Sequence, residues 1–162
     1  MKLNKQKTKS YIDCLSSNYD TVAILSTINK EEIAGALTIS SFVSVSIEPK
    51  LVLFCINKDN FLSDIQLNQK ISISFLSVDQ EELSILCSGS ISHDDRIAGD
   101  NWNKKNGFIY NKNARFVLFC SAKDVIGKGS HNIIISEVNE YNELNMEKKP
   151  LIYGERKYYK IK

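Results

Sequence analysis

An uncharged window rich in hydroxyls, followed by an apolar run, constrains the fold of this chain more than any other feature. The window runs from Ile33 to Ile47 and holds five serine and threonine hydroxyls among β-branched and aromatic residues, a composition typical of a strand. Glu48-Pro49-Lys50 then predicts a turn, because proline cannot continue a hydrogen-bonded ladder. Leu51 to Ile56 is continuously apolar, which predicts a strand buried on both faces.

The segments on either side of this window predict further strands. Thr21 to Thr27 is rich in β-branched residues, and the polar turn Asn29 to Glu32 follows it, so a hairpin with the window is expected. Ile71 to Leu76 alternates with a period of two, as a strand with one buried face does. Later strands are expected at residues 114–125, 131–139, 150–153 and 158–161, with a turn at 127–130.

Helical patterns are short. Apolar residues at helical spacing predict a helix over about residues 6–18. Residues 61–65 can form one or two helical turns with Asp59 or Asn60 as the N-cap, and 79–86 predicts a helix that Gly89 can close. The polar and aromatic stretch 92–113 is expected to be irregular. Many short strands, few helices and no repeat predict a β-barrel with small helical additions.

Length and composition favour one globular domain over residues 1–162. A chain of 162 residues with 43% hydrophobic and 25% charged residues can bury a sizeable core. A formal net charge of +2 implies no basic face for nucleic acid, although lysines crowd both ends. The uncharged window is too short and too rich in hydroxyls to span a bilayer. We therefore expect neither nucleic-acid nor membrane binding.

The cysteines and histidines show no metal-binding or catalytic spacing. Cys14, Cys55, Cys87 and Cys120 form no CxxC pair, which fits free thiols in a reducing cytoplasm. The two histidines lie at no ligand spacing with them, so no metal site is expected. The chain has no G-x-S-x-G, no Rossmann glycine pattern and no P-loop, which argues against a hydrolase and against the common nucleotide-binding folds.

A few polar features are left without a role in these patterns. They are the hydroxyl-rich strand, Asn57-Lys58 at a strand end, a helix start nearby, and Gly129-Ser130-His131 before a β-run. Together they could hold a phosphate, which suits the free amides of a helix start, and a planar polar ring. A sheet whose serines face water would have the same pattern, so both interpretations stay open here.

Several short segments occur in one order along nearly the whole chain. They are residues 35–49 with Leu51 to Asn57, Ser74-Phe75-Leu76 with Gln80, Leu83 and Gly89, Asp95-Arg96 and Trp102, Gly129-Ser130-His131, and Pro150 to Tyr153. This ordered set resembles the flavin reductase family of the FMN-binding split-barrel fold, the reductase components of two-component flavin-dependent monooxygenases. The resemblance implies a mainly β, Greek-key-type antiparallel split barrel with a few short helices.

The resemblance also implies roles for individual residues. Those expected along the flavin are Thr38, Ile39, Ser40 and Ser41, then Cys55, Ile56, Asn57 and Lys58 at the end of the next strand. Those expected at the phosphate are Asn60 and Ser63, and those beside the ring are Cys87, Ser88 and Gly89. His131 would be the catalytic residue that positions the nicotinamide, with Tyr153 close to the same site.

Four positions depart from the family's pattern. Ser130 stands where the family usually has Asp before the histidine, Leu62 where a Thr is common, Cys87 where a Phe is usual, and Lys50 where a second proline is usual. These changes bear on the choice of flavin and of pyridine nucleotide.

The function that the resemblance implies is NAD(P)H-dependent flavin reduction. Hydride would pass from NADH or NADPH to FMN or FAD, and the reduced flavin would supply a partner monooxygenase. A homodimer with the flavin near the subunit interface is implied as well. The alternatives are a split-barrel flavoprotein oxidase of the pyridoxamine-phosphate oxidase type, or a non-catalytic module that carries a flavin or a haem.

Overall fold

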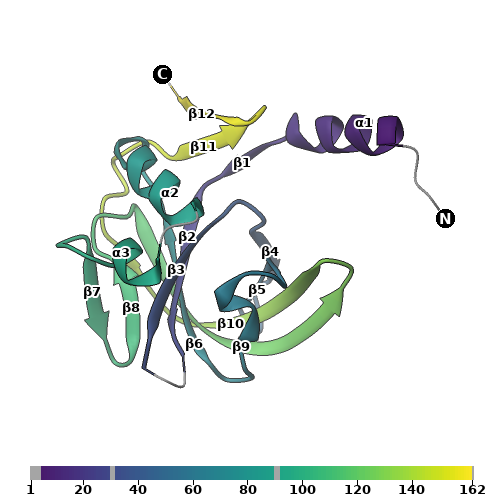
Figure 1. The fold of residues 1–162 in the computed structure, drawn as a ribbon. Coiled ribbons are helices and arrows are strands. Elements are labelled where there is room, and N and C mark those ends of the chain that lie inside the picture. The colour runs from purple at the N-terminus through teal and green to yellow at the C-terminus, as the bar shows by residue number, and fades with distance from the viewer. Residues whose placement is uncertain (1–4, 30–31, 90–91, 162) are drawn as a thin grey trace.

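A curved antiparallel sheet forms the body of the protein in the computed structural model, which describes residues 5–29, 32–89 and 92–161 (Figure 1). The strands are β1 (Tyr19–Thr21), β2 (Ala23–Ile28), β3 (Ala34–Ile39), β4 (Val43–Ser46), β5 (Leu51–Asn57), β6 (Lys70–Phe75), β7 (Trp102–Lys105), β8 (Phe108–Asn111), β9 (Phe116–Lys128), β10 (His131–Glu143), β11 (Leu151–Gly154) and β12 (Lys157–Lys160). The helices are α1 (Lys5–Ser16), η1 (Phe61–Asp64), η2 (Val78–Gln80), α2 (Glu81–Ser88) and α3 (His93–Arg96).

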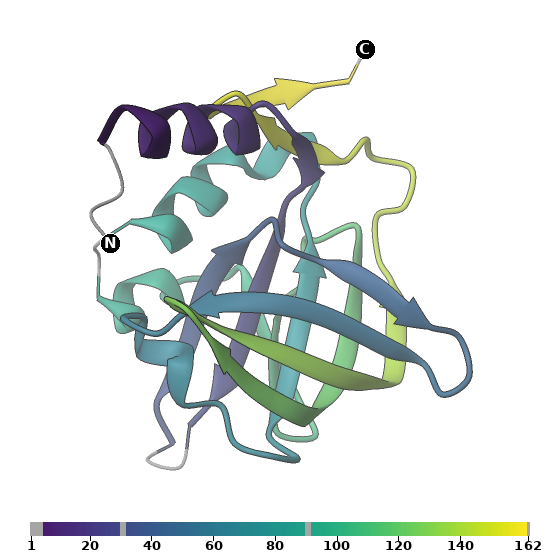
Figure 2. The same cartoon turned by 90° about the vertical axis from the view of Figure 1, so that its right-hand side faces the viewer.

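The seven-stranded sheet has the order β3-β2-β6-β9-β10-β5-β4 and curls into a barrel (Figures 1 and 2). Its two longest strands, β9 and β10, pair over their whole length with two register shifts. Such irregularities bend a strand and increase its twist, which allows the pair to wrap around the barrel. The strands predicted from alternation and from the apolar run are therefore confirmed, with boundaries shifted by a few residues.

The hydroxyl-rich window forms two strands that lie at opposite ends of this order. The expected single return strand ends at Ile39, where β3 stops pairing with β2, and β4 begins at Val43 and pairs with β5. Ser41 lies in the break, and its hydroxyl accepts a hydrogen bond from the backbone N–H of Cys55 at 3.0 Å and lies 3.2 Å from the Cys55 carbonyl. The side chain thereby replaces a ladder contact and ties the end of β3 to β5.

The core fills the inside of the barrel. Along β5, Val52, Phe54 and Ile56 are buried, while the alternate residues are partly exposed. These three pack with Leu25 and Ile134 from other strands in one cluster. β5 thus has one buried face and one half-exposed face, whereas the apolar run predicted burial on both.

A second, three-stranded sheet of order β1-β11-β12 lies beside the barrel and confirms the two short C-terminal strands. The stretch 92–113 is not irregular as expected, because it contains α3 and the hairpin of β7 and β8. Asn106 and Gly107 form the turn of this hairpin with φ values of 50° and 81°. Asn-Gly is the dipeptide that a tight hairpin turn favours, so this signal was present in the sequence and was missed.

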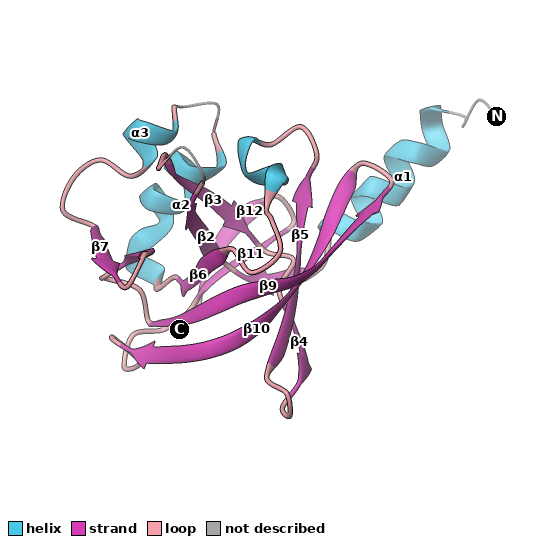
Figure 3. Cartoon of the chain, turned by 90° about the horizontal axis from the view of Figure 1, so that it is seen from below, coloured by secondary structure: helices cyan, strands magenta, loops and turns pink. Residues whose placement is uncertain are grey.

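The predicted helices form close to their expected positions. The Asn60 side chain accepts the N–H of Leu62 at the start of η1, and the N–H of Gly89 bonds the Ile85 carbonyl at the end of α2, so both predicted caps are confirmed. Helix α1 projects away from the barrel (Figure 3). Its Tyr11, Ile12 and Leu15 side chains are exposed.

Gly154 is a position where the fold tolerates no side chain. A Cβ atom there would lie 2.7 Å from the Tyr19 ring and 2.8 Å from the backbone oxygen of Asn18. Gly154→Ala is expected to lower the free energy of unfolding by about 1–3 kcal/mol, the usual cost of overpacking, measured by urea denaturation. Gly127→Ala is the matched control, because its Cβ would meet no atom closer than 3.4 Å. Equal stability of the two variants would contradict the close packing of β11 on β1.

Candidate functional site

A cavity of about 220 Å³ lies where the end of β3 faces the C-terminal sheet. Its lining residues are Val22, Thr38, Ile39, Ser40, Ser88, Tyr153 and Tyr158. Five of these seven were predicted as site residues, and they come from β3, α2 and β11. The fold therefore brings together segments that are far apart in the sequence. Hydroxyls and aromatic rings share the lining, a combination suited to a planar ring with a polar edge.

Hydrogen bonds fix two walls of this cavity. The Thr38 hydroxyl donates to the Ser84 carbonyl at 2.7 Å, which holds α2 against β3. The Ser84 hydroxyl lies 2.8 Å from the Tyr158 hydroxyl, and burial raises the pKa of Tyr158. The Tyr153 and Tyr158 rings meet edge to face with centroids 5.0 Å apart. Tyr158 was missed in the sequence because its strand has two adjacent tyrosines between two lysines, and no local signal shows which tyrosine faces the cavity.

The C-terminal end of α2 forms another part of the wall. Ser88 and Gly89 are exposed there, whereas Cys87 is fully buried behind them and packs in a core cluster with Val22. The buried guanidinium of Arg96 donates to the Ala36 carbonyl of β3 at 2.9 Å and to the Gly89 carbonyl. Arg96 therefore sets the separation between α2 and β3, a role that the sequence did not reveal.

β5 ends beside η1 and the turn between β9 and β10 (Figure 3), and a second group of predicted residues lies on these segments. His131 pairs with Asn57 at the last position of the β5–β10 ladder. The backbone N–H of Lys58 donates to the Ser130 carbonyl at 3.0 Å, and its ammonium donates to the Gly129 carbonyl at 2.8 Å. Lys58 and His131 are thus held on one exposed edge of the barrel.

The turn expected to bind phosphate has most of its backbone donors engaged within itself. The N–H groups of Asp59 and Asn60 bond to Asn57, and those of Leu62 and Ser63 bond to Asn60. An anion at this turn would therefore meet side chains: the Lys58 ammonium, the Asn60 amide and the Ser63 hydroxyl. The Ser63 carbonyl in turn accepts the Asn132 amide of β10 at 3.1 Å, which joins the turn to the neighbouring strand.

Ser41 connects the cavity with this edge. It follows Ser40 of the cavity and bonds to Cys55, two residues before Asn57. Ser41 therefore joins the end of β3, where Thr38 and Ser40 line the cavity, to the strand that ends at Asn57. Ile56, like Cys87, is a predicted site residue whose side chain lies in the core, because it is 1% exposed and packs inside the barrel.

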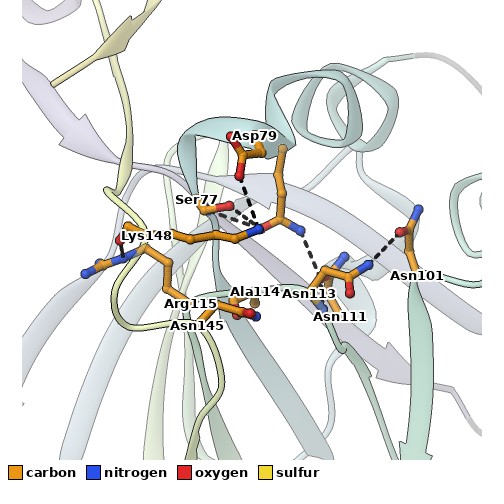
Figure 4. A network of polar contacts seen from close by, with 10 residues as sticks. Ser77, Asp79, Asn101, Asn111, Asn113, Ala114, Arg115, Asn145 and Lys148 are labelled. Atoms are coloured by element: carbon orange, nitrogen blue, oxygen red, sulfur yellow. Dashed lines mark hydrogen bonds and ion pairs between the residues drawn. The ribbon is translucent and has the colours of Figure 1, made fainter. Parts of the chain in front are cut away.

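A wider hollow of about 550 Å³ lies beside the start of α2, next to the polar network of Figure 4. Its polar groups largely bond to one another: Lys148 pairs with Asp79 at 3.1 Å, and the Asn113 amide donates to Asn101 at 3.0 Å. The buried Gln80 side chain donates to the Asn111 amide oxygen at 3.0 Å and accepts the backbone N–H of Ser77 at 3.1 Å. These two bonds anchor the start of α2 to β8. No predicted site residue lines this hollow, so we place the site at the smaller cavity.

The described residues offer neither a cluster of metal ligands nor a membrane-spanning helix. Within residues 5–29, 32–89 and 92–161, no three His, Cys, Asp or Glu side chains gather in a way that could hold a metal ion. In the described part of the chain, none of the helices combines the length and hydrophobicity that crossing a bilayer requires.

Comparison with known proteins decides the family. The model of the flavin reductase like domain matches residues 15–162. The chain belongs to this family. The flavin reductase family relatives include the reductase component of an FADH(2)-dependent resorcinol hydroxylase from Rhizobium sp., 28% identical over 75% of this chain and 69% of the relative. The FMN reductase (NADH) RutF of Pseudomonas syringae pv. syringae is 26% identical over 94% of this chain and 85% of the relative.

Solved structures confirm the split-barrel fold. The NADH:FAD oxidoreductase SgcE6 of Streptomyces globisporus, solved in complex with NAD and FAD fragments, superposes with a TM-score of 0.85. The match covers 100% of this chain and 97% of that chain at 17% sequence identity. The architecture of the family is therefore present in full, although few individual residues are shared.

The buried cysteines of this flavin reductase family member should be chemically inert. Burial raises the pKa of the Cys87 thiol to about 11 and that of Cys120 to about 12, so neither forms the reactive thiolate near neutral pH. In a titration with Ellman's reagent at about pH 8, we expect only Cys14 and Cys55 to react before denaturation. Cys87→Ser should leave the native thiol count unchanged. A drop of one thiol in that variant would show that Cys87 is accessible from the cavity.

Proposed function

We propose that the protein is an NAD(P)H-dependent flavin reductase that transfers hydride from NADH or NADPH to FMN or FAD. The match of the family model to residues 15–162 carries this proposal. The names of the relatives agree, because they describe an FMN reductase that uses NADH and the reductase component of a hydroxylase. The hydroxyl-lined cavity, which five of the predicted residues line, supports a flavin site at this end of β3.

The residues present suit a flavin. The Thr38, Ser40 and Ser88 hydroxyls can bond the polar edge of its ring system, and the paired tyrosines give the ring an aromatic wall. The cavity is smaller than the roughly 300–1,000 Å³ of most small-molecule sites, so a flavin would extend beyond it. We assign the ribityl chain and the phosphate to Asn57, Lys58, Asn60 and Ser63, at the end of β5 and in the turn after it.

The chemistry would come from the flavin, which accepts hydride at N5 when bound, while the protein provides binding and orientation. His131 is assigned to position the nicotinamide, with Tyr153 on the cavity side of the same site. Gly89 and the buried Cys87 and Ile56 support the walls by packing and backbone position, and Ile39 closes the cavity floor. No acid or nucleophile is required for this transfer, and none of these residues needs to gain or lose a proton.

Oxidation of NADH and of NADPH, each followed at 340 nm while FMN, FAD or riboflavin is titrated, tests the function. We expect oxidation whose rate rises with added flavin and saturates, with multiple turnovers per protein. Oxidation that does not depend on added flavin, with flavin held tightly through gel filtration, would favour an oxidase of the pyridoxamine-phosphate oxidase type. A Soret band or a bound flavin without turnover would indicate a carrier and contradict the proposal.

We further propose that the protein works in the cytoplasm as a homodimer and passes reduced flavin to a monooxygenase. A relative described as a hydroxylase reductase component supports the partner, and four free cysteines fit a reducing compartment. The half-exposed outer face of the barrel supports the dimer. Val43 is 54% exposed and forms one cross-strand row with Leu53 and Ile135. Val45, on the same strand as Val43, is 48% exposed.

Light scattering coupled to gel filtration tests the dimer. We expect a molar mass of two chains for the unaltered protein. For Val43→Asp we expect the molar mass to fall toward that of one chain, because a charge on this row would be buried in the dimer without a partner. Lys104→Glu, on the separate hairpin of β7 and β8, is the control and should keep the dimer. A monomer in the unaltered protein would contradict the dimer and leave the reductase proposal standing.

A further inference from the structure

We infer that Lys58 and Ser130 are positioning residues that hold His131 in place for the pyridine nucleotide, an inference that rests on the proposed function. Lys58 holds the turn that precedes His131, and Ser130 holds the imidazole ring itself. Neither assignment follows from the match to the family. Lys58 was expected at the flavin phosphate, and Ser130 is a departure from the family's usual residue.

Lys58 binds the β9–β10 turn at two consecutive carbonyls. Its backbone N–H reaches Ser130 at 3.0 Å and its ammonium reaches Gly129 at 2.8 Å. Gly129 has a φ of 56°, so the chain reverses sharply at the carbonyl that the ammonium holds. The side chain also packs against the turn, because the Lys58 ammonium lies 3.4 Å from the Cβ position of Gly127. One residue at the end of β5 thereby fixes the turn from two directions.

Ser130 orients the ring that the turn carries. Its hydroxyl lies 2.8 Å from Nδ1 of His131. When one imidazole nitrogen has a fixed partner, the ring orientation is set and the other nitrogen is left for a ligand. Here the partner is a neutral hydroxyl, at a position where the family usually has an aspartate. His131 would therefore contact the nicotinamide through Nε2, without a carboxylate behind it.

Both contacts are on the protein surface, so their loss should change the placement of His131 without unfolding the chain. Lys58 and Ser130 are exposed, as is His131. His131 is tied to the barrel by its ladder position opposite Asn57 and Lys128, which keeps the backbone in register when a side chain is removed. The expected consequence is a poorer fit of the pyridine nucleotide, with flavin binding measured separately.

A double-mutant cycle tests the inference. At saturating FMN for each variant, Lys58→Ala, Ser130→Ala and His131→Ala should each raise KM for NADH roughly three- to tenfold, the range expected from one hydrogen bond, with kcat changing less. The Lys58→Ala/His131→Ala double variant should be no worse than His131→Ala alone, because Lys58 acts through the histidine. Additive effects in the double variant would overturn the inference.

Lys128→Ala is the matched control, since it removes the same charge from the same turn, and the Lys128 side chain makes no hydrogen bond or ion pair with the described part of the chain. It should leave KM for NADH within about twofold of the unaltered protein, because surface charges far from a close contact contribute little. A rise equal to that of Lys58→Ala would mean that general attraction of the anionic nucleotide explains the effect, and would overturn the role of Lys58.

A measurement that needs no activity separates this inference from the proposed function. The chain has two histidines, so imidazole ¹⁵N spectra are simple to assign with His93→Gln. We expect Ser130→Ala and Lys58→Ala to shift the His131 ring resonances and to leave those of His93 in place. Unchanged His131 resonances in both variants would overturn the positioning role. Absence of both NADH and NADPH oxidation in the unaltered protein, with shifted resonances, would overturn the proposed function alone.

Discussion

The hydrogen bonds between the Ser41 hydroxyl and the backbone of Cys55 connect the two ends of the barrel, and the rest of the site depends on them. β3 and β4 lie at opposite ends of the strand order, and Ser41 joins the end of β3 to β5. This contact holds the end of β3, which lines the cavity, against the strand whose end carries Lys58 opposite His131. A serine that the sequence presented as a flavin ligand therefore also completes the fold.

Much of the fold could be predicted because the barrel strands alternate or carry continuous apolar runs. The division of the hydroxyl-rich window into two strands could not be predicted, because a hydrogen bond from a side chain to a distant backbone group produces no periodic pattern in the sequence. The β7–β8 hairpin was missed although Asn106-Gly107 marks its turn, because each strand has only four residues and β7 is polar. Hydrophobic periodicity thus predicted the strands that face the core. It did not predict the strand pairings that depend on a single turn or a single hydroxyl.

The residues of the candidate site also fall into those that could be predicted from the sequence and those that could not. Thr38, Ile39, Ser40, Ser88 and Tyr153 meet in one cavity, as a family resemblance could anticipate. Tyr158 and Arg96 act through contacts that cross the chain, to Ser84 and to the carbonyls of Ala36 and Gly89, and no spacing in the sequence points to them. Lys58 shows the same limit, because its bond to Gly129 spans 71 positions. Residue types were predictable, and their partners were not.

We propose that a flavin lies between the Thr38 cavity and the end of β5, and a crystal structure of the protein with FMN would test this placement. We expect the ring system between Thr38, Ser40 and Tyr153, with the phosphate near Lys58, Asn60 and Ser63. FMN bound elsewhere, for instance in the hollow beside Asn101 and Asn113, would contradict it.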